Sequence, residues 1–591
     1  MSASFCLVTS NLALRPACRL HHRLASQPQN GTSLPLRCGL QGSFPGASRG
    51  PTRSAACWTS SRRSSGFAIA AMAEGAVAEA GSGSRPGTYI TTSVTASTVE
   101  AMKAEIEEAI TGGADIVELR VDFLQRFDRE QDLKELIDAC SVPCIVTARA
   151  KWEGGSYEGD EASRLAALKL AASLGADYID VELLAAADFF EGGYSVPEGT
   201  KLILSNHDFE ATLPVEDLRK KVDAMWEAGA DIAKLATTAT DISHSIDVLS
   251  LLSYSEGPTV ALAMGERGVV TRLLAPKFGG FLTFAALEGR PSAPGQPTLG
   301  DMRQLYRAGS QGKDTKVFGI VGNPVSHSRS PVLHNAAMEM VGFDGVYVPL
   351  LVDDMEKFLQ AFSDPTFAGF SVTIPHKEAA LACADTVDPV AASIGAVNTL
   401  VRQSDGGLSA YNTDWEAAIN AIEEAVGGSE GLKGKTVVVL GAGGAGKAIA
   451  FGAAERGAKV IVANRNVERA AKLVKDLEGA EAVSLEKVAR GEVFGDVIAN
   501  TTSVGMHPME DDSPVDSEAL KNYEVAFDAI YTPMVTRLLR EAGEAGCTVV
   551  SGLEMFVGQA VKQFEHFTGK AATPEVVELM RQVVVDSLAD K

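Results

Sequence analysis

Eight short apolar runs recur between residues 89 and 286, and a pattern typical of a helix separates each run from the next. The expected strands are Tyr89–Val94, Ile116–Val121, Cys144–Ala148, Tyr178–Leu183, Leu202–Ser205, Ile232–Ala236, Thr259–Ala263 and Phe281–Ala286. A Gly-Ala-Asp triplet precedes the strands at residues 113–115, 175–177 and 229–231, where glycine suits the left-handed cap that ends a helix. Eight such units predict a (β/α)8 barrel. A doubly wound sheet alternates strands and helices in the same way and stays an alternative.

The chain continues well beyond this unit. At 591 residues it is too long for a single hydrophobic core, and its length suggests roughly three or four domains. Pro, Gly and Ser crowd both ends of residues 290–331, with a short helical pattern at Leu299–Arg307 between them. The chain changes character across this stretch, so we expect two α/β units in series that are joined there.

The first 73 residues differ from the rest of the chain in charge. They contain no Asp or Glu and eight Arg, and they are rich in Ser, Pro and small residues. That composition is typical of an organelle transit peptide. A disordered tail with no targeting role is the alternative. No compact apolar segment follows a basic start, which argues against a secretory signal.

Charge and cysteine content exclude several kinds of partner. The net charge of -23 argues against nucleic acid and against an anionic membrane surface. No apolar run approaches the ~20 residues of a membrane span. Four cysteines follow the N-terminal segment (Cys140, Cys144, Cys383 and Cys547), without a CxxC pair, so we expect buried thiols and no metal site. Small molecules are the expected partners. The sequence does not determine the oligomeric state, and a monomer is the working expectation.

Polar side chains lie at the ends of the expected barrel strands, where the chemistry of such barrels is found. They are Glu118 and Arg120 in the second strand, Arg149 in the third with Glu153 beyond it, His207 in the fifth, Lys234 in the sixth, Arg272 after the seventh, and Ser292 and Gln296 after the eighth. Each alone has a structural explanation; Glu118 and Arg120, for example, could form an ion pair. Because charges in apolar strands are costly unless paired, their gathering predicts a polar pocket for an anion.

Lys234 suggests the chemistry of this pocket. A lysine between apolar neighbours has a lowered pKa, so part of it is neutral and nucleophilic. With a carbonyl substrate it forms a Schiff base, and His207 is then the candidate general base, a role worth about 10²–10⁴-fold in rate. The arginines would hold a carboxylate or hydroxyl groups. These residues predict a Schiff-base lyase, and a class I aldolase fits them equally well.

The motifs ELRVD, SNHDF, DIAKLA and SAPGQ resemble type I 3-dehydroquinate dehydratases over the whole first half, and the spacing from Arg149 to Glu153 matches that family. The resemblance implies that Lys234 forms the imine and that His207 transfers the proton and assists loss of water. It further implies that Arg272 holds the substrate carboxylate, that Glu118, Arg120 and Arg149 line the hydroxyl side, and that Ser292 and Gln296 close over the substrate on a mobile loop. No cofactor is implied for this half.

A second set of motifs begins after the joining stretch. An expected strand, Val317–Val321, leads to the sequence GNPVSHSRSP and an expected helix, Val332–Met340. Ser328 and Ser330 come just before this helix, where hydroxyl and free N–H groups favour an anion. Helix capping by one serine explains the same residues. The motifs SVTIPHK, GAVNTL and YNTD follow, with Thr373 and Lys377, Asn398 and Thr399, and Asp414 respectively. Spacing alone does not pair these side chains.

Gly441–Gly446 reads GAGGAG, between a buried strand, Thr436–Leu440, and an expected helix, Lys447–Arg456. This is the dinucleotide-binding fingerprint in its required strand–turn–helix context. The next strand, Val460–Ala463, ends in Asn464 and Arg465 where an NAD site places an acidic residue. An arginine accommodates a 2′-phosphate, so the sequence favours NADP. An exposed arginine at the end of a strand is the alternative.

The motifs HSRSP, SVTIPHK, GAVNTL, YNTD, GAGGAGKA and GLEMFVGQA resemble shikimate dehydrogenases, in the family's order. The resemblance implies that Lys377 and Asp414 form the catalytic pair and that Lys377 handles the proton at the carbonyl oxygen. The implied substrate residues are Ser328 and Ser330 for the carboxylate, Thr373, Asn398, Thr399, Asp414 and Gln559 for the hydroxyls, and Tyr531 and Gln563 nearby. The implied NADP residues are Gly441, Ala442, Gly443, Gly444, Ala445, Gly446, Asn464 and Arg465, with Met506 near the nicotinamide. Asn466 stands where this family often has Thr.

The fused order resembles that of plant bifunctional enzymes. It implies dehydration of 3-dehydroquinate followed by NADPH reduction of 3-dehydroshikimate to shikimate, a route to aromatic amino acids, in the plastid stroma. The expected parts are a transit peptide at 1–73, a (β/α)8 barrel at 88–300, an α/β substrate domain at 316–430, a Rossmann NADP domain at 431–545 and C-terminal helices at 546–591 that pack back on the substrate domain.

Two other functions stay open. A quinate-preferring dehydrogenase is one, although Ser328 and Thr373 are the residues expected for shikimate. A regulatory binding protein that keeps the folds without the chemistry is the other. It predicts loss of Lys234, His207, Lys377 or Asp414, and all four are present.

Overall fold

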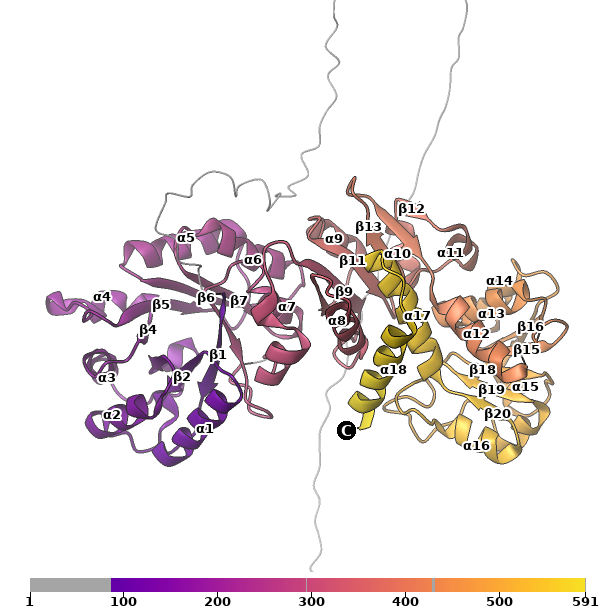
Figure 1. Ribbon diagram of the computed structural model, residues 1–591, viewed down its shortest axis with the longest axis horizontal. Coiled ribbons are helices and arrows are strands. Elements are labelled where there is room, and N and C mark those ends of the chain that lie inside the picture. The colour runs from indigo at the N-terminus through magenta and orange to yellow at the C-terminus, as the bar shows by residue number, and fades with distance from the viewer. Residues whose placement is uncertain (1–86, 294, 428–430, 590–591) are drawn as a thin grey trace, which may run out of the picture. The chain divides into compact units, whose positions relative to one another are not determined.

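The computed structural model describes residues 87–589, except 294 and 428–430 (Figure 1). The transit-peptide prediction for residues 1–73 lies outside the described residues. Within them the strands form one eight-stranded sheet followed by two six-stranded sheets. None of the helices in this part of the chain is both long enough and apolar enough to cross a membrane.

The first sheet is parallel and almost closes on itself. Its strands are β1 (Tyr89–Val94), β2 (Ile116–Arg120), β3 (Cys144–Thr147), β4 (Tyr178–Glu182), β5 (Lys201–His207), β6 (Ile232–Thr238), β7 (Thr259–Met264) and β8 (Leu282–Ala285). From β1 to β7 each strand pairs with the next, and β8 pairs with β1. The Phe281 backbone N–H donates to the Thr259 carbonyl at 2.8 Å, which joins the start of β8 to the start of β7. The (β/α)8 prediction is confirmed, and some strand ends differ from the expected ones by one or two residues.

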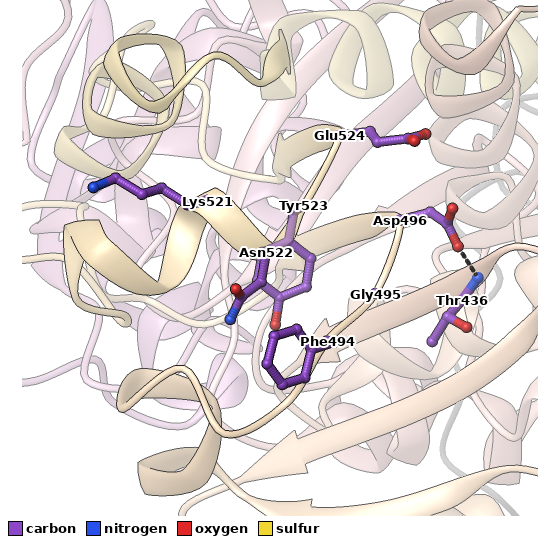
Figure 2. Close-up of a pocket in the computed structure, with 8 residues that line it drawn as sticks. All are labelled: Thr436, Phe494, Gly495, Asp496, Lys521, Asn522, Tyr523 and Glu524. Atoms are coloured by element: carbon purple, nitrogen blue, oxygen red, sulfur yellow. Dashed lines mark hydrogen bonds between the residues drawn. The ribbon is translucent and has the colours of Figure 1, made fainter.

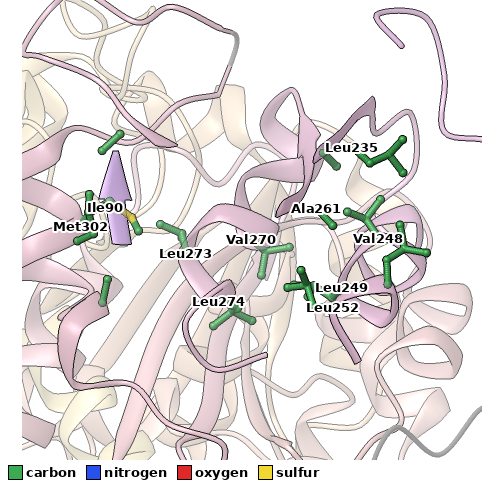
Figure 3. Close-up of a cluster of buried hydrophobic side chains, with 14 of the residues drawn as sticks. Ile90, Leu235, Val248, Leu249, Leu252, Ala261, Val270, Leu273, Leu274 and Met302 are labelled. Carbon is green, nitrogen blue, oxygen red and sulfur yellow. The ribbon is translucent and has the colours of Figure 1, made fainter. Parts of the chain in front are cut away.

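Helices cover the outside of the barrel. They are α1 (Val99–Thr111), α2 (Arg129–Ala139), α3 (Glu161–Ser173), α4 (Ala186–Phe189), α5 (Val215–Glu227), α6 (His244–Tyr254) and α7 (Val269–Leu274). Figure 3 shows part of the buried layer, with Ile90, Leu235 and Ala261 from the strands, Val248, Leu249 and Leu252 from α6, Val270, Leu273 and Leu274 from α7, and Met302. The glycines of the repeated triplet, Gly113, Gly175 and Gly229, have φ of 93°, 95° and 92°, as a left-handed helix cap requires.

The inward faces of the strands change from apolar to polar along the barrel. Ile116, Ile145, Ile203 and Ile232 are part of one buried apolar cluster near the strand starts. Successive side chains alternate across a strand, so the residues two positions later face the same way. Those residues are Glu118, Thr147, Ser205 and Lys234, and all are buried. A polar site therefore forms inside the barrel toward the carboxyl ends of the strands.

The second sheet is mixed. Its strands are β9 (Lys316–Gly322), β10 (Gly345–Leu351), β11 (Phe367–Val372), β12 (Thr386–Val387), β13 (Thr399–Arg402) and β14 (Leu408–Tyr411), in the order β10-β9-β11-β13-β14-β12. The helices of this part are α8 (Ser330–Met340), α9 (Met355–Ala361), α10 (Lys377–Cys383) and α11 (Pro389–Ile394). The predicted start of α8 at Val332 is wrong, because the helix begins at Ser330. Pro331 is tolerated there, since the first turn needs no backbone N–H donor.

The third sheet is parallel throughout. Its strands are β15 (Thr436–Leu440), β16 (Lys459–Asn464), β17 (Glu481–Ser484), β18 (Val497–Asn500), β19 (Val525–Asp528) and β20 (Thr548–Val550). Their order, β17-β16-β15-β18-β19-β20, is that of a dinucleotide-binding Rossmann sheet, which confirms the prediction. The order reverses between β15 and β18, and ligands of such sheets bind at the carboxyl ends of the strands next to that point.

Helices α12 (Asp414–Val426), α13 (Gly444–Glu455), α14 (Val467–Val474), α15 (Leu485–Ala489) and α16 (Arg537–Ala545) accompany this sheet. Two helices end the described chain, α17 (Gly552–Thr568) and α18 (Pro574–Ala589). Helix α17 packs against α12, and α18 packs against α8. The chain thereby brings side chains of α17 to the second sheet.

Candidate active sites

Lys234 on β6 has two carboxylate partners inside the barrel. Its Nζ lies 2.7 Å from Asp180 Oδ2 and 3.5 Å from Glu118 Oε1, and 4.7 Å from the centroid of the Phe284 ring. The predicted apolar surroundings of Lys234 are wrong, because β2 and β4 contribute charges to the same face. Burial acts to raise the pKa of Asp180, but Arg149 and Lys234 together hold it well below its usual range. The Lys234 amine thus lies against two carboxylates, Asp180 and Glu118, whose pKa values are both lowered.

Arg149 binds the same group of carboxylates. Its guanidinium lies 2.8 Å from Asp180 and 3.0 Å from Glu182, and it donates to Ser205 Oγ at 2.8 Å. Arg164 is fully buried on the other side of Glu182 and also donates to the Ala148 carbonyl at 2.9 Å. These contacts direct Arg149 to protein groups, whereas the resemblance placed it on the hydroxyl side of the substrate.

Three members of this network were not predicted from the sequence: Asp180, Glu182 and Arg164. A signal was available for two of them. Strand β4 reads Tyr-Ile-Asp-Val-Glu, so its charged residues alternate with apolar ones and face one side. Arg164 lies within a helix of ordinary composition, and nothing in its spacing separates it from a surface arginine.

His207 ends β5 and is held by Glu153. Its ring Nδ1 lies 2.9 Å from Glu153 Oε2, which also accepts the His207 backbone N–H at 3.1 Å. Burial lowers the pKa of His207 well below its ordinary value, and Arg149 and Lys234 add to this effect. Burial raises the pKa of Glu153 to about 7. A proton on Nδ1 directed at Glu153 leaves Nε2 as the basic nitrogen, as a general base requires.

Arg272 is buried with part of its guanidinium unpaired. Its Nη1 donates to the Ala263 carbonyl at 2.8 Å, and its buried Nε has no hydrogen-bond partner among the described residues. Burial lowers the pKa of Arg272 to about 10. A buried unpaired cation is costly, and an incoming carboxylate would satisfy it. This geometry fits the role implied for Arg272.

The other predicted barrel residues have protein partners. Glu118 accepts from the Ser93 and Thr147 hydroxyls, and Arg120 forms a two-bonded pair with Asp122 at 2.8 and 2.9 Å. An ion pair for Arg120 therefore exists, with Asp122 as the partner in place of Glu118. On the loop after β8, the Ser292 backbone N–H and hydroxyl donate to Gln296 Oε1 at 2.9 and 3.1 Å.

The second half contains a lysine–aspartate pair that spacing could not reveal. Lys377 is the first residue of α10 and donates through Nζ to Asp414, the first residue of α12. The start of a helix stabilises the Asp414 carboxylate. The Asn398 side chain donates to the other oxygen of that carboxylate at 3.0 Å. The two residues named as the catalytic pair are thus in direct contact.

Asn398 connects several of the predicted substrate residues. Its Oδ1 accepts from the Thr399 hydroxyl at 2.9 Å and from the Thr413 N–H at 2.8 Å, and its Nδ2 lies 3.4 Å from Gln559 Oε1. Gln563 on α17 donates to the Asn398 carbonyl at 3.0 Å. The Thr399 hydroxyl is directed at Asn398, which suits support of that residue.

The other residues predicted to bind the substrate of the second half also have defined local contacts. The Ser328 and Ser330 hydroxyls lie 3.2 Å apart at the start of α8. The Thr373 N–H donates to the Val321 carbonyl at 2.9 Å, and a Cβ at Gly322 would lie only 2.4 Å from Thr373 Cγ2. Tyr531 stacks on Phe556, with ring centroids 4.1 Å apart.

Three glycines of the fingerprint have separate steric reasons. Gly441 has a φ of 110°, which disfavours any side chain. A Cβ at Gly446 would lie 2.3 Å from the Gly441 carbonyl oxygen, and one at Gly444 would lie 2.8 Å from Lys377 Cδ. Helix α13 begins at Gly444, three residues before the predicted Lys447, so its free N–H groups face the turn. Ala442 is buried and Ala445 is half-buried beside these glycines.

The end of β16 carries the groups expected near a 2′-phosphate. Arg465 is exposed, and the Asn464 side chain donates to the Asn466 carbonyl at 2.9 Å. The Asn466 side chain accepts from the Arg469 N–H at 3.1 Å and so caps α14. Asn and Thr are both good N-caps, so Asn466 can cap this helix as the Thr implied by the resemblance would. Met506 is 39% exposed on the loop after β18.

An open pocket of about 390 Å³ lies elsewhere in the Rossmann sheet (Figure 2). It is lined by Thr436, Phe494, Gly495, Asp496, Lys521, Asn522, Tyr523 and Glu524. The Thr436 N–H donates to Asp496 at 2.7 Å inside it. Thr436 begins β15, whereas the fingerprint follows its last residue, so this pocket lies at the opposite edge of the sheet from the predicted cofactor site.

Four family models match the chain. They are type I 3-dehydroquinase at residues 90–313, the shikimate dehydrogenase substrate binding domain at 320–400, shikimate/quinate 5-dehydrogenase at 423–528, and the shikimate 5′-dehydrogenase C-terminal domain at 552–585. The matches cover both halves in the order that the motifs indicated.

The chain is also similar to individual proteins, some of which cover most of it and others less than half. The chloroplastic bifunctional 3-dehydroquinate dehydratase/shikimate dehydrogenase of Arabidopsis thaliana is 51% identical over 497 residues, 82% of each chain. A shikimate dehydrogenase (NADP(+)) of Bacillus cereus strain B4264 is 39% identical and covers 46% of this chain and 99% of its own. A crystal structure of Thermus thermophilus shikimate 5-dehydrogenase with NADP(H) and shikimate is 36% identical, covers 45% of this chain and 99% of its own, and has a TM-score of 0.40.

Proposed function

Given that the chain belongs to the family of bifunctional 3-dehydroquinate dehydratases/shikimate dehydrogenases, we propose that Lys234 and Lys377 serve two separate active sites for consecutive reactions. The chain is a lyase and an oxidoreductase of the shikimate pathway. The observation that supports two sites most directly is the pair of independent lysine–carboxylate contacts, Lys234 with Asp180 and Lys377 with Asp414.

In the barrel, Lys234 Nζ attacks the ketone of 3-dehydroquinate after giving up a proton, and water leaves as the imine forms. Asp180 and Glu118 lie close enough to hold that nitrogen before and after the attack. His207 Nε2 takes the proton from the carbon next to the imine and returns it to the departing hydroxyl. Hydrolysis of the imine frees Lys234 and releases 3-dehydroshikimate, so the net change is loss of one water. Arg272 holds the substrate carboxylate throughout.

In the second half, Lys377 gives a proton to the carbonyl oxygen of 3-dehydroshikimate as the ketone becomes an alcohol. Asp414 and Asn398 hold the Lys377 ammonium group and the substrate hydroxyls in place. NADPH, when bound, supplies the hydride. The turn Gly441–Gly446 and Arg465 fit the dinucleotide, because the glycines allow close backbone approach and no acidic residue follows β16 directly. The Bacillus cereus relative, named for NADP(+), supports this choice of cofactor.

The proposal is tested with the full chain and two single variants. With 3-dehydroquinate and NADPH supplied together, and no other enzyme, the chain should consume NADPH. Lys234→Ala should abolish dehydration and leave oxidation of shikimate by NADP+ intact, whereas Lys377→Ala should do the opposite. Loss of both activities in either variant, while circular dichroism shows a folded protein, would contradict two separate sites.

Substrate choice in the second half has its own test. The proposal makes shikimate the preferred alcohol, because Ser328 and Thr373 are the residues expected for it. Oxidation of shikimate and of quinate by NADP+ should be compared at equal concentrations. A higher kcat/KM for quinate would establish the alternative dehydrogenase.

The same proposal covers location and organisation. The acid-free, arginine-rich residues 1–73 and the chloroplastic relative support import into the plastid stroma. A fluorescent protein fused behind these residues should enter plastids, and diffuse cytosolic fluorescence would refute it. We propose domains at 88–300, 316–430 and 431–550; the expected boundary at 545 is too early, because β20 (Thr548–Val550) pairs with β19 in the Rossmann sheet. The helices from Gly552 onward belong to the substrate domain. We also propose a monomer, which light scattering would test.

A further inference from the structure

Tyr347 on β10 faces the same side of its sheet as Ser371 on β11. It pairs with Phe318 on β9, and Ser371 on β11 pairs with Ile320 on β9. Phe318 and Ile320 are two residues apart, so all four side chains leave the same face. Tyr347 and Ser371 lie on either side of β9, and a tyrosine side chain is long enough to reach across one strand. Helix α8, which begins at Ser330, packs on β10.

The hydroxyl of Tyr347 is buried without a partner. The residue has an exposed fraction of 0%, and its hydroxyl makes no hydrogen bond within the described part of the chain. Burial raises the pKa of this hydroxyl, and the neighbouring Ser371 and Ser330 hydroxyls act to lower it. By distance and angle, however, neither serine forms a hydrogen bond with Tyr347. His334, one turn after Ser330, stacks on the ring with centroids 4.3 Å apart. The ring is therefore fixed while its polar end is unsatisfied.

Two serines near this hydroxyl, Ser330 and Ser371, are connected to the residues implied for the two ends of the substrate. On one side, Ser330 belongs to the serine pair assigned to the carboxylate. On the other, Ser371 donates to Gln563 Oε1 at 2.7 Å, and Gln563 donates to the Asn398 carbonyl at 3.0 Å, on the hydroxyl side. A bound carboxylate would accept a hydrogen bond from the Ser330 hydroxyl. The Ser330 oxygen would then be a better acceptor, and the Tyr347 hydroxyl is a donor that makes no hydrogen bond with the described residues.

We infer that Tyr347 is a positioning residue for the carboxylate end of shikimate, whose hydroxyl donates to Ser330 Oγ when Ser330 binds the substrate. Tyr347 does not touch the substrate itself. The inference rests on the proposed assignment of Ser330 to the carboxylate. It explains why a tyrosine, and not a phenylalanine, lies at a fully buried position where its hydroxyl is unpaired in the free enzyme.

The first test is Tyr347→Phe, which removes only the hydroxyl. With saturating NADP+, we expect KM for shikimate to rise roughly three- to tenfold, as for loss of one neutral hydrogen bond, with kcat and the KM for NADP+ within about twofold of wild type. The unfolding temperature without substrate should stay the same or rise, because an unpaired buried polar group is removed. A purely structural tyrosine would lower stability and leave KM unchanged, which would overturn the inference.

Tyr523→Phe is the matched control. Its hydroxyl is also buried but donates to the Val493 carbonyl at 3.0 Å, in the Rossmann half. The same chemical change should lower the unfolding temperature there and leave the KM for shikimate unchanged. A rise in that KM in both variants would indicate a general effect of losing a buried hydroxyl and would count against Tyr347.

The double variant Ser330→Ala/Tyr347→Phe decides whether Tyr347 acts through Ser330. We expect its KM for shikimate to match that of Ser330→Ala alone within about twofold. Increases that multiply would show that Tyr347 acts elsewhere and would overturn the inference. If Ser330→Ala itself leaves KM unchanged, the assignment of Ser330 fails and the inference with it, and that result is distinct from failure of Tyr347 alone.

Discussion

Two arginines in the barrel are equally buried and have opposite surroundings. Arg164 is fully paired with Glu161, Glu182 and a backbone carbonyl, whereas Arg272 has one carbonyl partner and an unpaired Nε. Burial alone therefore does not distinguish an arginine with a structural role from one that binds a ligand. The number of hydrogen-bond partners within the protein does distinguish them. Replacing Arg164 should therefore change the stability of the barrel, whereas replacing Arg272 should change substrate binding.

We expect Arg164→Gln to destabilise the barrel by about 3–5 kcal/mol, because it leaves Glu182 buried beside fewer positive charges. Arg272→Gln should leave the unfolding temperature unchanged or raise it, and should increase the KM for 3-dehydroquinate roughly 10- to 100-fold through loss of charged hydrogen bonds. Thermal unfolding and dehydratase kinetics on both variants measure the two effects. A marked loss of stability in Arg272→Gln would show that its charge is structural after all.

The lowered pKa of His207 makes a prediction about pH at the same scale. A base with a depressed pKa stays unprotonated as the pH falls, so the acid limb of dehydratase kcat/KM should lie below pH ~6.5, the ordinary value for histidine. Shikimate oxidation by the same preparation, measured over the same range, controls for unfolding. An acid limb at or above the ordinary value would mean that burial does not govern this imidazole.

At the scale of elements, β18 and β19 hold the loops that follow them through one buried carboxylate. Asp528 accepts from the Asn500 side chain at 3.1 Å, from the Ile530 N–H at 3.0 Å and from the Thr536 hydroxyl at 2.7 Å. Asn500 in turn accepts from the Thr502 N–H at 3.0 Å. One loop carries Tyr531 and the other carries Met506. Burial raises the pKa of Asp528 to about 6.

Asp528→Ala should release both loops together. We expect higher KM values for shikimate and NADP+ and roughly a tenfold lower dehydrogenase kcat, because reacting groups lose their alignment. The dehydratase activity of the same chain should not change and serves as the internal control. Thr536→Val removes only one of the three bonds and should have a smaller effect. If only one of the two KM values moved, the loops would be held independently.

The elements themselves were largely predictable from the sequence. Strand–helix alternation gave the barrel strands to within one or two residues at their ends, because buried parallel strands are continuous apolar runs. Helix starts were less predictable. Helices α8 and α13 begin at Ser330 and Gly444, since residues that are poor inside a helix are acceptable in its first turn.

The network behind the site residues was harder to predict. Lys377 and Asp414 are 37 residues apart, so only the fold brings them together. Asp180 and Glu118 replace the apolar surroundings that the sequence around Lys234 indicated, because neighbouring strands, and not flanking residues, surround an inward side chain.

At the scale of the whole molecule, each half has its own sheet or sheets and its own lysine–carboxylate pair. A ligand that binds only the native form of one half stabilises that half, by about 2.7 kcal/mol at 100 times its Kd. We expect NADP+ to raise the unfolding temperature of the dehydrogenase half and to protect the amides of Gly441–Gly446 from hydrogen exchange. Peptides from the barrel strands should exchange at the same rate with and without it.

Protection spread evenly over the barrel as well would contradict independent halves. Arg465→Ala is the control, because it should weaken the response to NADP+ and leave any response to NAD+ unaltered.

The close approach of Gly444 to Lys377 bears on redesign of the enzyme. A side chain at residue 444 would collide with the lysine, so mutagenesis aimed at the coenzyme should avoid that part of the turn. Arg465 is exposed at the end of another strand and touches none of the catalytic pair in the described structure. We therefore expect coenzyme preference and turnover to depend on different positions, so that a library built at 464–466 exchanges one coenzyme for the other and leaves the Lys377–Asp414 pair intact.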